Sequence, residues 1–350
     1  MTKEIIKVLL VDDSPFTLDY IRELIDKEDE IEIIDTANNG KEAVEKNIKL
    51  SPDVIVMDIE MPIMSGIEAT KKIMEEKPVP IIILTSSLNT RNLYKSFDAI
   101  KYGALEILNK PTKRPTEDWE ETVKTLLTTI KKVANIKVTK KIKREEKEVK
   151  IKKDDNDFSI ISINSSTGGP SALNTIFSNL KKDYKIPIVV AQHISIGFTQ
   201  GLVDWLNLYS PLKAKIAEEG ESIEGGNIYF PPDGAHLTVK NDKIKLLYAP
   251  PIKGIRPSGN ILLESVANNF GDETIGIILT GMGHDGLNGA KKIKELGGCV
   301  IAQELSSTIV SSMPSNIIKN NLADSILTPI EIAKTLLKIE EKKYENIISR

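Results

Sequence analysis

Cysteine and histidine, two residues that often define a protein's chemistry, are scarce in this chain of 350 residues. Cysteine occurs once, at Cys299, and histidine occurs three times. A single cysteine cannot form an intramolecular disulfide, and disulfide-stabilised scaffolds belong to oxidising compartments. We therefore exclude a small secreted disulfide fold and expect a cytoplasmic protein.

Long apolar runs and an excess of one charge are also missing. A membrane helix needs about eighteen uncharged apolar residues, and the opening "MTKEIIKVLLVDDS" has charges inside its apolar run, unlike a secretory signal. The 47 Lys and Arg nearly balance the 50 Asp and Glu, for a net charge of −3. We expect no membrane insertion, no nucleic-acid partner and a monomer.

The length suits two domains, because single cores stop growing near about 250 to 300 residues. Between 135 and 157 lies "NIKVTKKIKREEKEVKIKKDDND", in which charged residues dominate and almost nothing can be buried. We predict a first domain over 1–134, a charged linker over 135–157 and a second domain over 158–350. The linker is interpreted as a solvated tether or exposed helix, with contact to an acidic partner as the alternative.

The first domain alternates helical stretches with short apolar runs, a pattern typical of parallel strands buried on both faces. Five such runs predict a five-stranded parallel, doubly wound sheet; they cover 5–13, 31–37, 53–58, 79–85 and 104–111. In the second domain similar runs predict another mostly parallel doubly wound sheet, with an antiparallel hairpin over 237–248 and a C-terminal helix from 329 to 343. The runs are 158–164, 185–193, 214–220, 227–234, 274–281 and 299–304.

Polar residues gather where the strands of the first sheet end, and ligands of open α/β sheets bind at this edge. These residues are Asp12, Asp13, Asp58, Thr85 and Lys110. Carboxylates brought together repel one another unless a cation lies between them, and Mg²⁺ prefers such oxygen ligands. Each residue alone is more often a helix cap, but five in register predict a phosphoryl site.

The motifs "VLLVDDSP", "VIVMDIEMPIMSGIEA", "IIILTSS" and "NKPT" resemble the receiver domain of response regulators, which has a flavodoxin-like fold. The resemblance implies that Asp58 is the phosphoacceptor, that Asp12, Asp13 and Asp58 bind Mg²⁺, and that Thr85 and Lys110 sense the phosphoryl group. It also implies a histidine kinase as phosphodonor. Ile107 stands where receivers commonly have an aromatic switch residue.

In the second domain, three hydroxyl residues, Ser165, Ser166 and Thr167, lie between a strand and a helix. They suit an N-cap, but a helix N-terminus also stabilises an oxyanion. A nucleophilic serine needs a base. His193 follows a strand on the same edge, whereas His236 is interpreted as structural.

The stretch "GMGHDG" over 281–286 has the spacing of a dinucleotide-binding loop, with Glu304 where a ribose-binding acid would fall. Against this interpretation, the motif should open its sheet, and here fewer than seventy residues follow it. The alternative is that the glycines turn the backbone so that Asp285 reaches His193 in a Ser-His-Asp arrangement. His284 is next to Asp285, so their side chains should diverge.

The motifs "SSTGGP", "AQHISIGFT", "GGNIYFPPDGAHL", "RPSGN", "ILTGMGHDG" and "SSMPSN" resemble the catalytic domain of chemotaxis protein-glutamate methylesterases. The resemblance implies Ser166 as nucleophile, His193 as base and Asp285 as its partner, with the Met282 amide and Thr167 at the oxyanion hole and no cofactor at this site. It also implies hydrolysis of γ-methyl esters on chemoreceptor cytoplasmic domains, release of methanol, deamidation of receptor glutamines, and control by phosphorylation.

Several positions depart from that family's usual residues without removing a triad member. They are Asn164 and Ser165 in place of Gly-Ala, Ser195 and Ile196 in place of two prolines, Asn260 in place of Asp, His284 in place of Asn, and Ser312 in place of Gly. Because they surround the pocket, one alternative is a phosphorylation-gated adaptor whose esterase site has drifted. A nucleotide-dependent oxidoreductase built on 281–286 is the other.

Overall fold

The structure is a computed structural model that describes residues 5–86, 90–111, 119–136 and 158–348. The chain divides into two compact units, Met1–Lys143 and Arg144–Arg350. The division falls within the predicted linker, most of which (137–157) lies outside the described residues. The domain boundaries at 134 and 158 therefore stay predictions.

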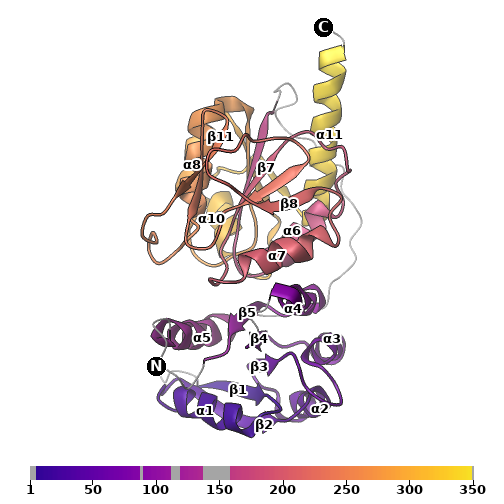
Figure 1. Cartoon of the computed structure of the whole chain (residues 1–350), viewed down its shortest axis with the longest axis vertical. Coiled ribbons are helices and arrows are strands. Elements are labelled where there is room, and N and C mark those ends of the chain that lie inside the picture. Colours follow the sequence, from indigo (N-terminus) through magenta and orange to yellow (C-terminus); the bar gives the residue numbers. More distant parts are fainter. Residues whose placement is uncertain (1–4, 87–89, 112–118, 137–157, 349–350) are drawn as a thin grey trace. The chain divides into compact units, whose positions relative to one another are not determined.

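The first unit is a five-stranded parallel sheet with helices around it, as predicted (Figure 1). The spatial order is β2-β1-β3-β4-β5, and every residue of the central strand β3 is buried. The strands are β1 Ile6–Val11, β2 Ile31–Ala37, β3 Val54–Asp58, β4 Ile81–Thr85 and β5 Glu106–Asn109. The helices are α1 Pro15–Ile25, α2 Gly40–Leu50, α3 Gly66–Glu76, α4 Thr90–Tyr102 and α5 Trp119–Val133.

Local sequence explains where the helices of this unit begin. Ser14 caps α1, because its Oγ accepts a hydrogen bond from the Thr17 amide, and Pro15 occupies the first helical position. Ser65 and Glu68 form a reciprocal capping box at the start of α3. Both helices start directly after a loop that follows a strand end, so these caps also shape the edge at which the predicted acids lie.

The second unit contains a seven-stranded sheet in the order β14-β13-β12-β6-β7-β9-β8, and all its strand pairs are parallel. Its strands are β6 Ile160–Ser165, β7 Ile188–Gln192, β8 Lys213–Ile216, β9 Asn227–Phe230, β12 Thr274–Ile278, β13 Cys299–Gln303 and β14 Ser325–Leu327. The sequence analysis missed β14, because a three-residue edge strand carries no clear apolar run. The helices are α6 Gly169–Phe177, α7 Thr199–Asn207, α8 Gly259–Phe270, η1 Gly271–Glu273, α9 Leu287–Glu295, η2 Leu305–Ser307, α10 Ser312–Lys319 and α11 Pro329–Ile348.

The predicted hairpin is present as a separate two-stranded antiparallel sheet of β10 His236–Lys240 and β11 Lys243–Leu247. Asn241 and Asp242 make its turn, with φ values of 52° and 56°. Positive φ at both central residues is the conformation of the type I′ turn of two-residue hairpins, and Asn and Asp tolerate it. The buried face of the hairpin packs on α8 in one apolar cluster.

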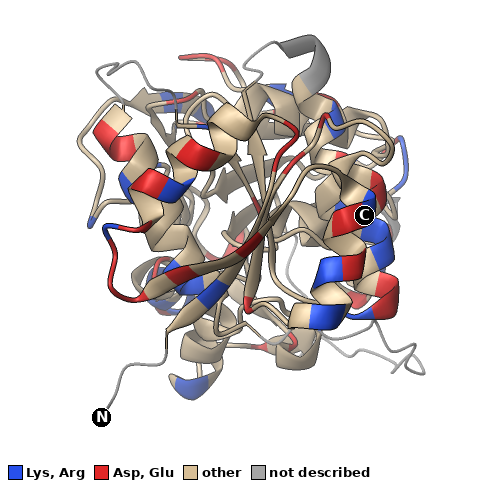
Figure 2. Cartoon of the chain, turned by 90° about the horizontal axis from the view of Figure 1, so that it is seen from below, with Lys and Arg blue, Asp and Glu red and all other residues tan. Residues whose placement is uncertain are grey.

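The C-terminal helix α11 is amphipathic, as its sequence pattern predicts. Ile332, Ala333 and Leu336 are fully buried. Exposed on its other side are Lys334, Lys338, Glu341 and Lys342. Acidic and basic residues are likewise interspersed on the helices that Figure 2 shows. The helix therefore closes one part of the core with its apolar face while its other face remains charged.

The order of the central strands determines where in the seven-stranded sheet a ligand can bind. The chain runs from β6 to β7 on one side, and it later returns with β12 to the other side of β6. Such a reversal of direction leaves a crevice at the carboxyl ends of the strands, where α/β proteins bind their ligands. The loops that follow β6, β7 and β12 carry the predicted serine, histidine and aspartate.

Candidate functional site

The aspartate in the glycine-rich loop reaches the predicted histidine. His193 Nε2 lies 2.8 Å from Asp285 Oδ2, and both side chains are largely buried. An ionised carboxylate can only accept a hydrogen bond, so Nε2 carries the ring proton and donates a hydrogen bond to Asp285. Nδ1 is then the ring nitrogen with a free lone pair.

Asp285 is held by the start of helix α8 as well as by His193. Its Oδ1 accepts hydrogen bonds from Ser258 Oγ at 2.9 Å and from the Asn260 amide at 3.1 Å, and the Gly259 amide donates to Oδ2. Burial alone would raise the pKa of the Asp285 carboxyl, but its hydrogen bond with His193 and the backbone donors of α8 bring that pKa below its ordinary value. The carboxylate is thus stabilised in its charged form.

Two serines lie at the end of β6, and they differ in accessibility. Ser165 pairs in register with Gln192 on the neighbouring strand, is fully buried, and donates its hydroxyl to Gln192 Oε1 at 2.6 Å. Ser166 is the first residue beyond β6, as His193 is the first residue beyond the neighbouring strand β7, and it is half-buried. Within the described part of the chain its hydroxyl, unlike that of Ser165, bonds to no protein group.

The glycines of the loop bring it close to Ser166. A Cβ on Gly281 would lie 2.7 Å from Ser166 Cβ and 2.2 Å from Met313 Sδ, so only glycine allows this approach. Gly283 and Gly286 have φ of 97° and 91°, which glycine adopts without strain. Between them, the Met282 amide donates to no acceptor among the described residues. The loop is therefore shaped around Ser166 and Asp285.

The other predicted residues occupy distinct places. The carbonyl oxygen of Thr167 accepts a hydrogen bond from Thr280 Oγ1 at 3.0 Å. His236 is fully buried, and the Ser258 amide donates to its Nδ1 at 2.9 Å, in agreement with a structural role. His284 turns away from Asp285, because Asn316 Nδ2 donates to its Nδ1 at 2.8 Å.

The sequence analysis missed residues that form hydrogen bonds with the predicted site residues. Gln192 is buried, and its Nε2 donates to the carbonyl oxygens of Ser166 and His193. Ser258 was not singled out either. Asn164, seen earlier only as a departure from the family, is fully buried against Gly259 and Gly286, and its amide atoms have no partner among the described residues.

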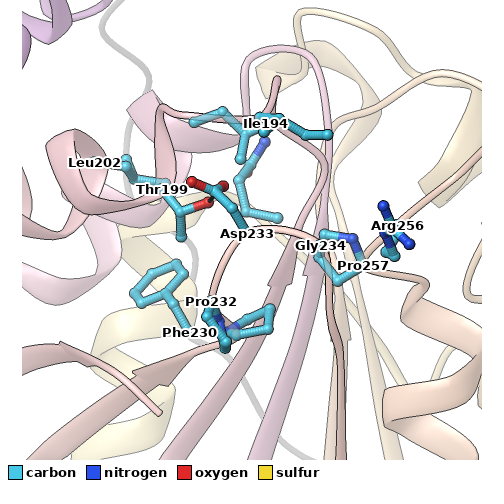
Figure 3. Close-up of a pocket in the computed structure, with 12 residues that line it drawn as sticks. Ile194, Thr199, Leu202, Phe230, Pro232, Asp233, Gly234, Arg256 and Pro257 are labelled. Carbon is cyan, nitrogen blue, oxygen red and sulfur yellow. Dashed lines mark hydrogen bonds between the residues drawn. The ribbon is translucent and has the colours of Figure 1, made fainter. Parts of the chain in front are cut away.

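A small pocket lies beside the end of β7 (Figure 3). Ile194, Leu202 and Phe230 supply apolar walls, and Arg256 and Pro257 close another side. Asp233 accepts hydrogen bonds from Thr199 Oγ1 at 2.5 Å and from the Gly197 amide at 3.0 Å. These bonds fix the loop that follows His193.

In the first unit, the predicted acids converge. The carboxylate oxygens of Asp12, Asp13 and Asp58 lie within 4.8 Å of one another. Lys110 Nζ lies between two of them, 2.7 Å from Asp12 Oδ2 and 2.8 Å from Asp58 Oδ2. Three hard oxygen donors at the ends of two neighbouring strands fit an Mg²⁺ ion.

Electrostatics in this cluster reflect burial and crowding. Burial raises the pKa of the Asp58 carboxyl, Lys110 lowers it in part, and the neighbouring charge of Asp12 raises it further. Burial would lower the pKa of Lys110, but its two carboxylate partners raise that pKa above the ordinary value. Thr85 is buried at the end of β4, and its carbonyl oxygen accepts the Lys110 amide. Ile107 is a buried core residue of β5.

The described helices include none long and apolar enough to cross a membrane. A serine, a histidine and an aspartate on three neighbouring strands, together with a receiver-type sheet and its carboxylate cluster, define the class: a response-regulator enzyme of the serine-hydrolase type. A model of the CheB methylesterase domain matches residues 161–336, and one of the response regulator receiver domain matches residues 8–117. The chain belongs to the CheB methylesterase family.

Individual relatives match along nearly the whole chain. The protein-glutamate methylesterase/protein-glutamine glutaminase 2 of Methanospirillum hungatei is 38% identical over 97% of this chain and 99% of its own length. The protein-glutamate methylesterase/protein-glutamine glutaminase of Thermotoga maritima is 37% identical over 97% of this chain and 100% of its own. The crystal structure of the Thermotoga maritima CheB methylesterase catalytic domain, 39% identical, superposes with a TM-score of 0.50 over 52% of this chain and 98% of that domain.

Proposed function

We propose that this protein is a protein-glutamate methylesterase and protein-glutamine glutaminase that uses Ser166, His193 and Asp285 as a catalytic triad. The observation that carries the proposal is the His193–Asp285 pair at 2.8 Å, in which His193 directly follows β7 as the half-buried Ser166 directly follows the paired strand β6. Without a base, a serine hydroxyl is a weak nucleophile at neutral pH. Ser165 does not suit this role, because it is fully buried and its proton is donated to Gln192.

The geometry fits the chemistry of ester hydrolysis. Ser166 Oγ attacks the γ-carbonyl carbon of a glutamate methyl ester while His193 Nδ1 takes its proton, and the Met282 amide, with Thr167 beside the nucleophile, stabilises the oxyanion. His193 then returns the proton to the departing methoxide, and methanol leaves. Water, deprotonated by His193, cleaves the acyl-enzyme to release the glutamate carboxylate and regenerate Ser166.

A glutamine side chain presents the same carbonyl to Ser166. Its leaving group, once protonated by His193, is ammonia instead of methanol, so one site serves both reactions. We propose the methylated cytoplasmic domains of chemoreceptors as substrates and the cytoplasm as the location. Membership of the family supports this assignment of the substrate.

The receiver unit regulates the esterase, and we propose that it does so through phosphorylation of Asp58 by a chemotaxis histidine kinase. Asp12, Asp13 and Asp58 would hold Mg²⁺. When bound there, the ion would neutralise the charge that develops on a transferred phosphoryl group. Lys110, already bonded to Asp58, would pair with a phosphoryl oxygen, and the Thr85 hydroxyl would contact another. The convergence of these side chains supports the proposal.

The decisive experiment compares the two adjacent serines. Methanol release from a methylated receptor fragment is measured for the full-length protein with a small-molecule phosphodonor and Mg²⁺. Ser166→Ala should lower the rate by at least about a thousandfold, whereas Ser165→Ala should keep at least about a tenth of it. If Ser165→Ala lowers the rate more than Ser166→Ala does, the nucleophile is Ser165.

The same assay separates the enzyme from a phosphorylation-gated adaptor. An adaptor would bind the methylated fragment but release no methanol in the wild-type protein. Ammonia release from a fragment with glutamine at the modified position tests the second activity. It too should disappear in Ser166→Ala.

A further inference from the structure

One buried amide links the two chain segments that carry the proposed nucleophile and base. Gln192 is the last residue of β7 and is 3% exposed. Its Nε2 donates to the carbonyl oxygen of Ser166 at 3.0 Å and to that of His193 at 2.7 Å. An amide nitrogen has two hydrogens, so both are used within the site.

Ser165 fixes which way this amide points. The Ser165 hydroxyl donates to Gln192 Oε1 at 2.6 Å. A flipped amide would place its oxygen against two carbonyl oxygens and its nitrogen against a hydroxyl that has no other acceptor in the described residues. The observed orientation is thus the one in which every polar atom of the group finds a partner.

The space around the amide is also shaped for it. A Cβ on Gly169, the first residue of helix α6, would lie 2.1 Å from Gln192 Oε1 and 2.8 Å from Ser165 Cβ. Gly169 also donates its amide to the Ser166 carbonyl at 2.7 Å. Glycine at this position lets the helix start directly above the Gln192 side chain, close to Ser166.

We infer that Gln192 is a positioning residue, which holds the Ser166 turn and the His193 backbone at a fixed separation, and that Ser165 acts through it by orienting its amide. This inference rests on the proposed triad. Proton transfer from Ser166 to His193 depends on their mutual position, and a misplacement of about 1 Å costs about a hundredfold in rate. The last backbone hydrogen bond between β6 and β7 runs from the His193 amide to the Ser165 carbonyl oxygen at 2.9 Å, and beyond it the Gln192 amide adds a link between the carbonyl oxygens of Ser166 and His193.

The test measures kcat and KM for methanol release in the full-length protein. Gln192→Ala should lower kcat by about a hundredfold and change KM by less than about threefold, because the substrate contacts remain. Ser165→Ala should lower kcat by about threefold to tenfold. In the Gln192→Ala background, Ser165→Ala should have almost no further effect, because its partner is gone.

A matched control distinguishes positioning from stability. Gln303 is another buried glutamine, whose Oε1 accepts the Thr280 amide and whose Nε2 donates to the Ser307 carbonyl, without touching Ser166 or His193. Gln192→Glu and Gln303→Glu both introduce a buried carboxylate, and both should lower the melting temperature. Only Gln192→Glu should also lower kcat by more than about tenfold.

A second readout does not depend on the receptor substrate. Acylation of Ser166 by p-nitrophenyl acetate releases p-nitrophenolate, and its rate should fall in Gln192→Ala as kcat does. If the wild-type protein is acylated at Ser166 but releases no methanol, the methylesterase assignment fails while the inference is still tested by acylation. A folded Gln192→Ala variant with kcat and acylation rate within about threefold of wild type overturns the inference, as does a wild-type protein whose Ser166 is not acylated.

Discussion

Replacing Asp285 with asparagine tests the triad with almost no change in shape. In the wild type the carboxylate accepts hydrogen bonds from four groups, which belong to His193, Ser258, Gly259 and Asn260. An asparagine has one acceptor oxygen and one NH₂ group. If the oxygen stays with Ser258 and Asn260, the NH₂ group faces both the Gly259 amide and His193.

The consequence for the imidazole is a change of tautomer. Because the NH₂ group of the new asparagine donates, His193 Nε2 has to accept a hydrogen bond. The ring proton then moves to Nδ1. In the proposed mechanism Nδ1 is the nitrogen that receives the proton of Ser166. In serine proteases the corresponding Asp→Asn change lowers kcat by about ten-thousandfold. We expect a fall of about a thousandfold to ten-thousandfold here, which corresponds to about 4 to 5.5 kcal/mol in the activation free energy. KM should change by less than about threefold.

The assay is methanol release at saturating methylated receptor fragment, with Asp324→Asn as the matched control. Asp324 is a half-buried carboxylate that accepts hydrogen bonds from Lys294 Nζ and from the Val300 amide and bonds to no member of the proposed triad. Its variant should stay within about threefold of wild type in kcat. An Asp285→Asn protein that is folded and keeps more than about a tenth of the wild-type kcat would refute the assigned tautomer and the role of Asp285.

Three further predictions concern stability and regulation. Burial lowers the pKa of His236 from 6.5, so below that pH the unfolded chain binds a proton that the folded chain does not. The wild-type free energy of unfolding should then fall more steeply between about pH 6.5 and pH 5.5 than that of His236→Gln, by up to about 1.4 kcal/mol per pH unit in urea titrations; equal slopes would contradict this. In Gly259→Ala the new Cβ would lie 2.0 Å from Asn164 Cγ, and this collision should lower the free energy of unfolding, measured by thermal unfolding, by about 1 to 3 kcal/mol. If the double variant Gly259→Ala/Asn164→Gly is no more stable than Gly259→Ala, the collision with Asn164 is not the cause. In Asp58→Asn, and in the wild type with EDTA, acetyl phosphate should no longer increase the rate of methanol release. Stimulation that persists in Asp58→Asn would exclude Asp58 as the phosphoacceptor.

The fold could be predicted because buried parallel strands leave continuous apolar runs. The runs that end at Asp58 and Thr85 became β3 and β4, and the "ND" pair at Asn241 and Asp242 became the hairpin turn. Strand β14 could not be predicted, because an edge strand of three residues depends on its neighbour β13 for hydrogen bonds. Its three residues are too few to show the alternation or the apolar run that predicts a strand.

The site could be predicted only in part. Residues directly beyond a strand, such as Ser166 and His193, can be placed on one edge by topology alone. The support for Asp285 could not, because Ser258 to Asn260 come from a distant segment whose amides are invisible in a sequence. Gln192 looked like an ordinary strand residue, since its bonds to two carbonyl oxygens depend on how neighbouring turns meet.

The three segments that carry the proposed triad leave adjacent strands at the middle of a seven-stranded sheet, with two strands on either side. Fraying starts at the outermost strands, so local opening at β14 or β8 does not have to alter the spacing of the central ones. Insertions or deletions in the outer elements can therefore be accommodated while the three central segments keep their spacing.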